Sequence, residues 1–141
     1  MSLAVLQQPQ WFHDTVEEHL TQDPTWSQVE SAVRRLDQSN WQDIYLLPDA
    51  TDTSTWLSVG GGNGHYIVTG SIAEKEFPIF IGSPGATGTC LVSVAGQTGD
   101  YPASWVASLE QALQVAHVFF QAGSFDCGIK WHTADGGASE A

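Results

Sequence analysis

The sequence predicts an α+β fold, in which two main helices pack on an antiparallel β-sheet of about five or six strands. Two motifs that begin helices, one in the first third of the chain and one in the last, each precede apolar residues at three- and four-residue spacing. Between them lie short apolar runs separated by glycine and proline, as in strands joined by tight turns. No repeat or linker divides the chain, so we expect one domain at residues 24–132.

A capping box of Thr25 and Gln28, with Pro24 beside it, predicts the start of the first helix. The apolar stripe that follows consists of Trp26, Val29, Ala32, Val33 and Leu36. These positions share one face of a helix, which we expect to end near Gln38. Residues 1–23, before this helix, are expected to form an N-terminal arm or a short helix.

Short apolar runs after the first helix predict the strands of the sheet. The runs are 44–47, 56–59, 66–69, 78–81 and 89–94. Glycine and asparagine at 60–64 supply the positive φ values of a tight reversal and predict a hairpin connection. A phosphate-binding loop is disfavoured at this position, because a helix and usually a lysine would have to follow, whereas a strand follows and no lysine does.

A second capping box, formed by Ser108 and Gln111, begins the second helix. Its apolar stripe consists of Leu109, Ala112, Leu113, Ala116, Phe119 and Phe120. Gly123 follows the last of these, where a left-handed C-terminal cap is expected. We expect a final strand at 128–131 and a flexible tail at 133–141, which is rich in glycine, alanine and serine.

The charge balance limits the classes of partner. Sixteen carboxylates face four lysine and arginine side chains, which leaves a formal net charge of -12. Nucleic acids and anionic membranes are therefore unlikely direct partners, because both are bound through lysine and arginine. The charge would accelerate the encounter with a cationic protein, including one whose basic cleft normally holds nucleic acid. Acidity also confers solubility by itself, so this alternative stays open.

No pattern of a catalytic, cofactor or metal site is present. Cys90 and Cys127 have no CxxC partner, and five histidines are scattered without the spacing of metal ligands. We expect two reduced, buried thiols, no cofactor and no catalytic residues. The segment 1–11 lacks a secretory signal, and no stretch approaches the roughly 18 apolar residues that cross a bilayer, so we expect a cytoplasmic location.

The candidate partner-binding residues are mainly carboxylates and neighbouring aromatic side chains, a combination found at interface hot spots. They are Asp49, Asp52, Trp56, His65, Glu74, Glu76, Asp100 and Tyr101. In a strand, Glu74 and Glu76 would share one face and form an anionic stripe. His65 is included because it lies beside the glycine-rich hairpin, in a loop position. The tryptophans at 26, 105 and 131 lie in apolar elements and are assigned to the core.

Several stretches, taken in order, carry a resemblance to a known family. They are the helix at 26–36, the glycine-turn hairpin, WVASLEQAL at 105–113, FFQAG at 119–123 and IKW at 129–131. Over residues 24–132 the series resembles immunity protein family one of bacterial polymorphic toxin systems, which are encoded beside toxins of the deaminase fold. The resemblance implies a 1:1 complex with a zinc-dependent nucleic-acid deaminase toxin, plausibly one acting on cytosine in DNA, which this chain would block.

The resemblance rests on structural positions, so it does not locate the interface. The chain lacks the HxE and PCxxC zinc signature, which argues against its being a deaminase itself. Two alternatives stay open. One is a small enzyme that uses acids and His65 in a sheet-bounded pocket, and the other is a regulatory or adaptor domain of similar fold. An enzyme would lose activity when one or two acid or histidine positions are replaced, whereas inhibition should survive Cys90→Ala and His65→Ala and weaken when Glu74 and Glu76 become Lys.

Overall fold

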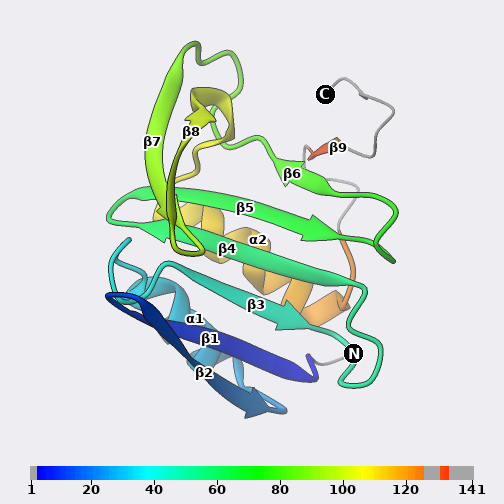
Figure 1. Cartoon of the computed structure of the whole chain (residues 1–141). Coiled ribbons are helices and arrows are strands. Elements are labelled where there is room, and N and C mark those ends of the chain that lie inside the picture. Colours follow the sequence, from blue (N-terminus) through cyan, green and yellow to red (C-terminus); the bar gives the residue numbers. More distant parts are fainter. Residues whose placement is uncertain (1–2, 126–130, 134–141) are drawn as a thin grey trace.

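One antiparallel sheet with both helices on the same face forms the body of the molecule (Figure 1). The computed structural model describes residues 3–125 and 131–133. Within them the strand order is β2-β1-β3-β4-β5-β6-β9. The strands are β1 (Val5–Phe12), β2 (Thr15–Gln22), β3 (Asp43–Leu47), β4 (Trp56–Gly62), β5 (His65–Ser71), β6 (Pro78–Phe80) and β9 (Trp131–Thr133). The predicted α+β class is confirmed.

Both helices begin at the capping boxes that the sequence predicts. In α1 (Trp26–Arg35) and α2 (Leu109–Ala122), the cap side chain and the side chain three residues later exchange hydrogen bonds with each other's backbone. Gly123 ends α2 at φ 70°, the left-handed cap. The helices bury their apolar stripes against one face of the sheet. The core of that layer includes Val29, Val33, Ile44, Leu46, Leu57, Val59, Val68, Ala112, Ala116 and Phe119.

The N-terminal segment is a β-hairpin, so the prediction of an arm or a short helix was wrong. The ladder between β1 and β2 runs from Val5 opposite Gln22 to Phe12 opposite Thr15. Strand β1 also pairs with β3, and Leu6 is fully buried in the core. This hairpin is therefore the edge of the main sheet and part of the folded domain.

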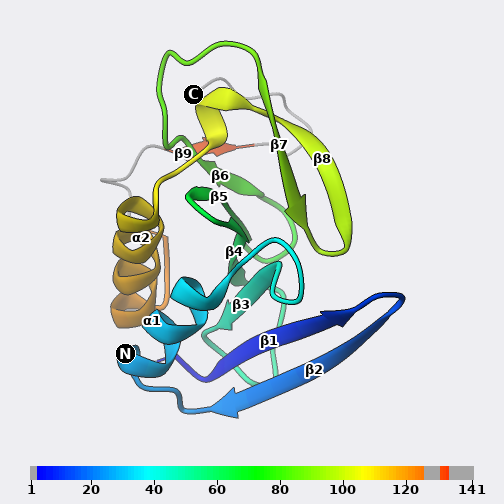
Figure 2. The same ribbon diagram turned by 90° about the vertical axis from the view of Figure 1, so that its left-hand side faces the viewer.

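A second hairpin, β7 (Thr89–Val94) with β8 (Gln97–Pro102), forms a separate two-stranded sheet. The prediction that the run at 89–94 extends the main sheet was wrong, because this hairpin crosses the face opposite the helices (Figure 2). Glycine allows the close approach. A Cβ added at Gly60 in β4 would lie 2.6 Å from Cγ1 of Val94. The valine therefore packs directly on the strand backbone.

The glycine-rich connection is confirmed as a hairpin. Asn63 and Gly64 form its two-residue turn with φ values of 56° and 89°, as a type I′ turn requires. Gly62 still belongs to β4, where it pairs with His65. The turn thus lies at the opposite end of β4 from Trp56, which begins this strand.

The predicted core tryptophans have different environments. Trp26 and Trp131 pack against the core, as predicted. Trp105 does not belong to that cluster: it ends a short 3-10 helix, η1 (Ala103–Trp105), and its ring lies 6.2 Å from that of Tyr101. Of the predicted last strand, Trp131 begins β9, whereas 128–130 and the predicted tail beyond 133 lie outside the described residues.

Candidate partner-binding site

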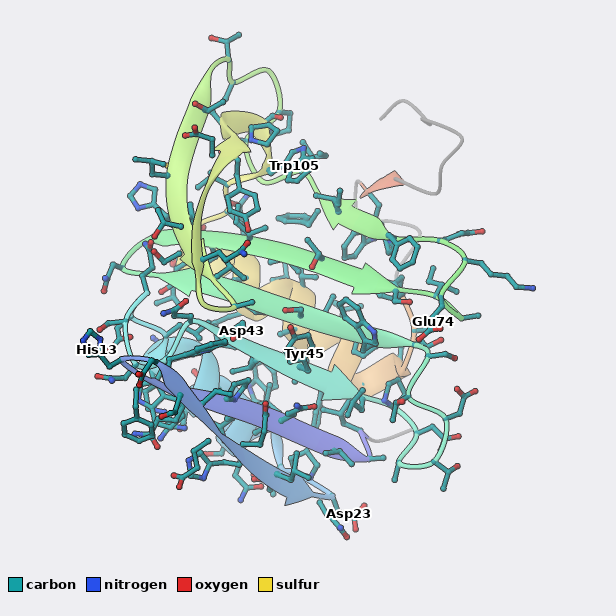
Figure 3. The ribbon with its side chains drawn as sticks, viewed as in Figure 1. His13, Asp23, Asp43, Tyr45, Glu74 and Trp105 are labelled. Atoms are coloured by element: carbon teal, nitrogen blue, oxygen red, sulfur yellow. The ribbon has the colours of Figure 1, made fainter. Side chains whose placement is uncertain are left out.

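Four of the predicted site residues lie in two loops at one end of the sheet. Asp49 and Asp52 belong to the β3–β4 loop, and Glu74 and Glu76 to the β5–β6 loop, in which Figure 3 labels Glu74. All four are exposed. We call residues 48–55 and 72–77 the acidic loop pair.

Two hydrogen bonds hold the acidic loop pair together. The Oγ of Ser71, the last residue of β5 before the second loop, donates to the carbonyl oxygen of Ser54 at 2.8 Å. The backbone N–H of Ala73 donates to Oγ1 of Thr55 at 3.0 Å. Carboxylates that are far apart in the sequence are thereby held at the same edge of the molecule.

Local hydrogen bonds favour the ionised form of both aspartates in this pair. The backbone N–H and the hydroxyl of Thr51, together with the N–H of Asp52, donate to Asp49 and lower the pKa of its carboxyl. The hydroxyl and N–H of Ser54 lower the pKa of Asp52 in the same way. The loop therefore presents two fixed negative charges at neutral pH.

The glutamates do not lie in a strand, so the predicted stripe on one strand face was wrong. Ala73 and Glu74 occupy a tight turn with φ values of 56° and 58°, closed by the N–H of Lys75 donating to the carbonyl of Ile72 at 3.0 Å. Glu76 follows this turn and bridges to Ile72. A turn projects these side chains from the end of the sheet instead of along one face.

The other predicted residues lie elsewhere. His65 is exposed at the opposite end of β4 and β5 from the acidic loop pair. Asp100 and Tyr101 are neighbours in β8, and strand alternation points their side chains to opposite sides. Asp100 is exposed, whereas Tyr101 is half-buried. The structure thus does not bring the eight predicted residues into one surface.

A groove that the sequence analysis missed lies on the open face of the sheet, opposite the helices. It has a volume of about 560 Å³. Its lining residues come from β1, β2, β3, the β3–β4 loop, β4 and the β7–β8 turn. They are Gln7, Pro9, Trp11, Val16, Glu18, Asp43, Tyr45, Leu47, Thr53, Trp56 and Ala95. We call this feature the open-face groove; among the predicted site residues, Trp56 lines it.

The two hairpins shape this groove. Figure 2 shows both of them projecting from the sheet on the side away from the helices. The turn of β7–β8 meets the turn end of β1–β2, where a Cβ on Gly96 would lie 2.7 Å from the Trp11 ring. The N–H of Gly96 also donates to Oε1 of Gln42 at 2.8 Å. These contacts fix the position of the turn at the groove.

A buried carboxylate lies at the bottom of the groove. Asp43 is 1% exposed, and its Oδ1 accepts a hydrogen bond from the indole N–H of Trp11 at 3.3 Å. Burial raises the pKa of Asp43, and the negative charge of Glu18 adds to this rise. Hydrogen bonds from Tyr45 and Trp11 oppose it only in part. Burial also raises the pKa of Tyr45, next to the Asp43 carboxylate, so its hydroxyl stays protonated.

Comparison with known families decides the class of protein. The family model described as Immunity protein Imm1 matches residues 17–133, from β2 to β9. The chain belongs to the Imm1 immunity protein family. The resemblance seen in the sequence is thereby confirmed. No curated protein and no solved structure matches the chain.

As a member of the Imm1 family the chain is an immunity protein, and its partner is a cognate toxin. The matched span contains both helices, the acidic loop pair and most of the sheet. It begins at Glu17, so Trp11 and the rest of β1 lie outside it. One wall of the open-face groove is therefore not part of the family match.

The described residues also bear on the predictions about metal ligands, thiols and membrane spans. No three histidine, cysteine, aspartate or glutamate side chains are grouped there as metal ligands. Cys90 is a free thiol in β7 and is half-buried, less enclosed than expected, and Cys127 lies outside the description. In the same part of the chain, no helix is long and apolar enough to cross a membrane.

Proposed function

We propose that this Imm1 protein binds a cognate toxin that is a zinc-dependent nucleic-acid deaminase, acting on cytosine in DNA, and covers its basic substrate cleft. The complex is a 1:1 heterodimer that forms in the cytoplasm, and inhibition requires no catalysis by the immunity protein. The Imm1 match over residues 17–133 carries the inhibitory role. The deaminase as target rests on the family resemblance and is supported by charge.

The charge argument follows from what such a toxin must bind. An enzyme that acts on a base in a nucleic acid needs lysine and arginine around the channel that receives the strand. A protein with a formal net charge of -12 competes for the same side chains. Neutralising an intracellular toxin also requires near-complete occupancy, and nanomolar affinity corresponds to about -12 kcal/mol.

The distribution of charge supports an interface on the sheet and loop side. Of the described basic side chains, Arg34 and Arg35 lie in α1, and Arg34 pairs with Glu30 on the same helix at 3.1 Å. Lys75 is the single lysine or arginine in the acidic loop pair. Four exposed carboxylates therefore outweigh one cation at that end of the sheet.

The experiment begins with the product of the adjacent gene. We expect the two proteins to co-purify and the immunity protein to abolish the neighbour's deaminase activity on a DNA substrate. Inhibition should survive Cys90→Ala and His65→Ala, because no catalytic residue is needed. A neighbour without toxin activity, or one that does not bind, would contradict the proposal.

Charge reversal tests the acidic loop pair. Glu74→Lys should slow association with the toxin by about threefold, and the Glu74→Lys/Glu76→Lys double variant by about tenfold, because steering depends on rim charges. Stopped-flow association rates at low and high salt measure this, and the difference should shrink as salt rises. The matched control is Glu110→Lys in α2, on the helix side, which should leave the rate nearly unchanged. If the control slowed association equally, the effect would come from the total charge of the protein and not from the acidic loop pair.

A further inference from the structure

We propose that the open-face groove receives an arginine-bearing segment of the toxin, whose guanidinium lies against Tyr45 and Trp56 and pairs with the carboxylates of Asp43 and Glu18. The inference rests on the proposed function only in taking the toxin as the partner. It assigns the groove as the anchor of the complex, whereas the acidic loop pair steers the encounter.

The aromatic side chains form the walls of a cation site. The rings of Tyr45 and Trp56 lie 5.5 Å apart at an interplanar angle of 78°. Trp11 forms another wall, and its N–H holds the Asp43 carboxylate. Cations bind to the faces of tyrosine and tryptophan rings, and the attraction is stronger where water is excluded. A half-buried groove with three such rings favours a cation over an anion.

The carboxylates in the groove have no cationic partner within it. Among the described residues, the lining contains no lysine or arginine, and the ion pairs are those of Glu30 and Glu17. Asp43 interacts with neutral donors only. A buried carboxylate is costly unless a charge compensates it. A guanidinium from the partner would supply the compensating positive charge, which the described lining of the groove does not contain.

Glu18, which is exposed, adds a second carboxylate to the lining of the groove. Its Oε1 accepts a hydrogen bond from Nε2 of Gln7 on the neighbouring strand at 2.8 Å. Glu18, Asp43 and Tyr45 all line the groove, and the charge of Glu18 adds to the rise in the pKa of the other two groups. Two carboxylates near one another would both interact favourably with a single cation.

The rim of the groove is suited to a segment of protein. Val16 and Leu20 on β2 are 44% and 63% exposed, and their cross-strand partners Trp11 and Gln7 line the groove. Alternation places all four side chains on the same face of the hairpin. The volume of about 560 Å³ exceeds what one side chain needs and lies in the range of sites that enclose ligands. The neighbours of the arginine can therefore bury apolar area against this rim.

A guanidinium fits the groove better than an ammonium. Its plane stacks on aromatic rings, its donors match a carboxylate in pairs, and it is less strongly hydrated than the lysine head group. Entry into a site with a 1% exposed carboxylate requires dehydration, so the weaker hydration of arginine matters here.

The first experiment uses N-acetyl-arginine amide as the probe and the neutral citrulline analogue, of almost the same shape, as its control. The indole N–H resonance of Trp11 is identified by its loss in Trp11→Phe and followed by NMR during titration. We expect a saturable shift with the arginine compound, at a Kd on the order of millimolar. Asp43→Asn should abolish this shift, and the citrulline compound should produce none. No shift, or an equal shift with citrulline, would overturn the cation site, and an equal response to the lysine analogue would overturn the preference for a guanidinium.

The second experiment measures toxin affinity and separates this inference from the proposed function. Asp43→Asn and Trp56→Ala should each weaken binding by about 30-fold or more, mainly through faster dissociation, because both remove an anchor contact. Trp105→Ala is the matched control: its ring is also half-buried but lies outside the groove, and it should change Kd by less than about threefold.

The possible outcomes are distinct. Failure of the wild-type protein to bind the toxin would overturn the proposed function. Normal binding by correctly folded Asp43→Asn and Trp56→Ala variants would overturn the groove as anchor, and thermal melting and circular dichroism verify folding. If Trp56→Ala unfolds the protein, Asp43→Asn, which keeps the size of the side chain, carries the test alone, and normal binding by this folded variant would overturn the groove as anchor. Sedimentation that shows a dimer in the wild type and a monomer in Asp43→Asn would assign the groove to a second copy of this chain and overturn the proposal.

Discussion

The two faces of the same sheet are built for different purposes. In β3, Ile44 and Leu46 enter the core beneath the helices, whereas Asp43 and Tyr45, one position out of phase, line the groove on the other face. On the helix face, apolar side chains pack together and stabilise the folded state. On the open face, a carboxylate is buried, and its desolvation destabilises the folded state. The first face thus supplies stability, and the difference supports the proposal that the second binds a partner.

The largest loss of stability is expected from a core substitution on the helix face. Phe119 in α2 is 1% exposed in the core, so Phe119→Ala should lower the free energy of unfolding by about 3 to 5 kcal/mol, through lost burial and the cavity left behind. Urea denaturation followed by circular dichroism measures it. Leu91→Ala in β7 is the control: Leu91 is 65% exposed, and its truncation should change stability by less than about 0.5 kcal/mol. Similar losses in both variants would mean that the helix layer is not the main source of stability.

Local sequence signals predicted the helix face well. The capping boxes at Thr25 and Ser108 place both helix starts correctly, because a cap motif depends on residues only three positions apart. The strands at 43–47, 56–62 and 65–71 were predicted for a similar reason, since each is an apolar run bounded by turn residues. These are the elements whose environment follows from their own sequence.

The pairing in the two hairpins that shape the open face was not predicted: a strand at 89–94 was expected, but in the main sheet, and β2 and β8 were missed because they bury little. Every residue of β2 except His19 and Thr21 is exposed, so no apolar alternation identifies it as a strand. In β8, polar and glycine residues dominate, and its pairing with β7 depends on the turn at Ala95 and Gly96. Such strands form because a neighbouring strand provides their hydrogen bonds, and one segment read alone does not show this.

The groove combines residues that lie far apart in the chain. Trp11 and Asp43 are joined by a hydrogen bond across 32 positions, and Trp56 reaches the same groove from a third strand. One signal was present: Asp43 immediately precedes the apolar run at 44–47, so strand alternation would put its carboxylate on the same face as Tyr45. The register that brings Trp11 beside Asp43 follows only from the fold.

The second prediction breaks the packing of the open face. Gly60→Ala should place a methyl group 2.6 Å from Val94 Cγ1 and destabilise the protein by about 1 to 3 kcal/mol through overpacking. It should also weaken toxin binding, because Ala95 beside Val94 lines the groove. Denaturant unfolding and calorimetric titration with the toxin measure the two effects. The Gly60→Ala/Val94→Ala double variant removes the clash and should recover part of the binding; no recovery would contradict the contact as the cause.

The third prediction concerns how the buried carboxylate of the open face makes stability depend on pH. The pKa of Asp43 is raised above its ordinary value of 3.8, chiefly by burial. Between pH 3.8 and the raised pKa, the folded protein binds more protons at this group than the unfolded chain does. The destabilisation caused by burying the ionised carboxylate is therefore absent below pH 3.8 and complete above the folded pKa. Each unit of the rise is worth about 1.4 kcal/mol. Asp43→Asn removes this ionisation, so its stability relative to the wild type should improve as pH rises through that window.

Denaturant unfolding of both proteins at about pH 3.5 and about pH 7 measures this difference, in which the titrations of other carboxylates largely cancel. Glu18, whose charge acts on Asp43, is tested separately with Glu18→Gln, which should reduce the pH dependence without removing it. A stability difference that does not change with pH would show that the Asp43 carboxylate is not penalised in the folded state. A variant that is more stable at neutral pH and yet fails to bind the toxin would show directly that the open face sacrifices stability for binding.

The smallest effect tests whether the helix face can be weakened without changing the groove. Ser108 Oγ accepts the N–H of Gln111 at 3.2 Å, so Ser108→Ala should cost about 1 kcal/mol of unfolding free energy by leaving that donor without its cap. Toxin affinity should stay unchanged, because α2 lies on the opposite side of the sheet from the groove. Urea denaturation and calorimetric titration check the two results, and Ser31→Ala, at an exposed position inside α1, should be neutral or slightly stabilising. If loss of the cap weakened binding as much as the groove variants do, the two faces would be energetically coupled, and the division of stability and binding between them would have to be given up.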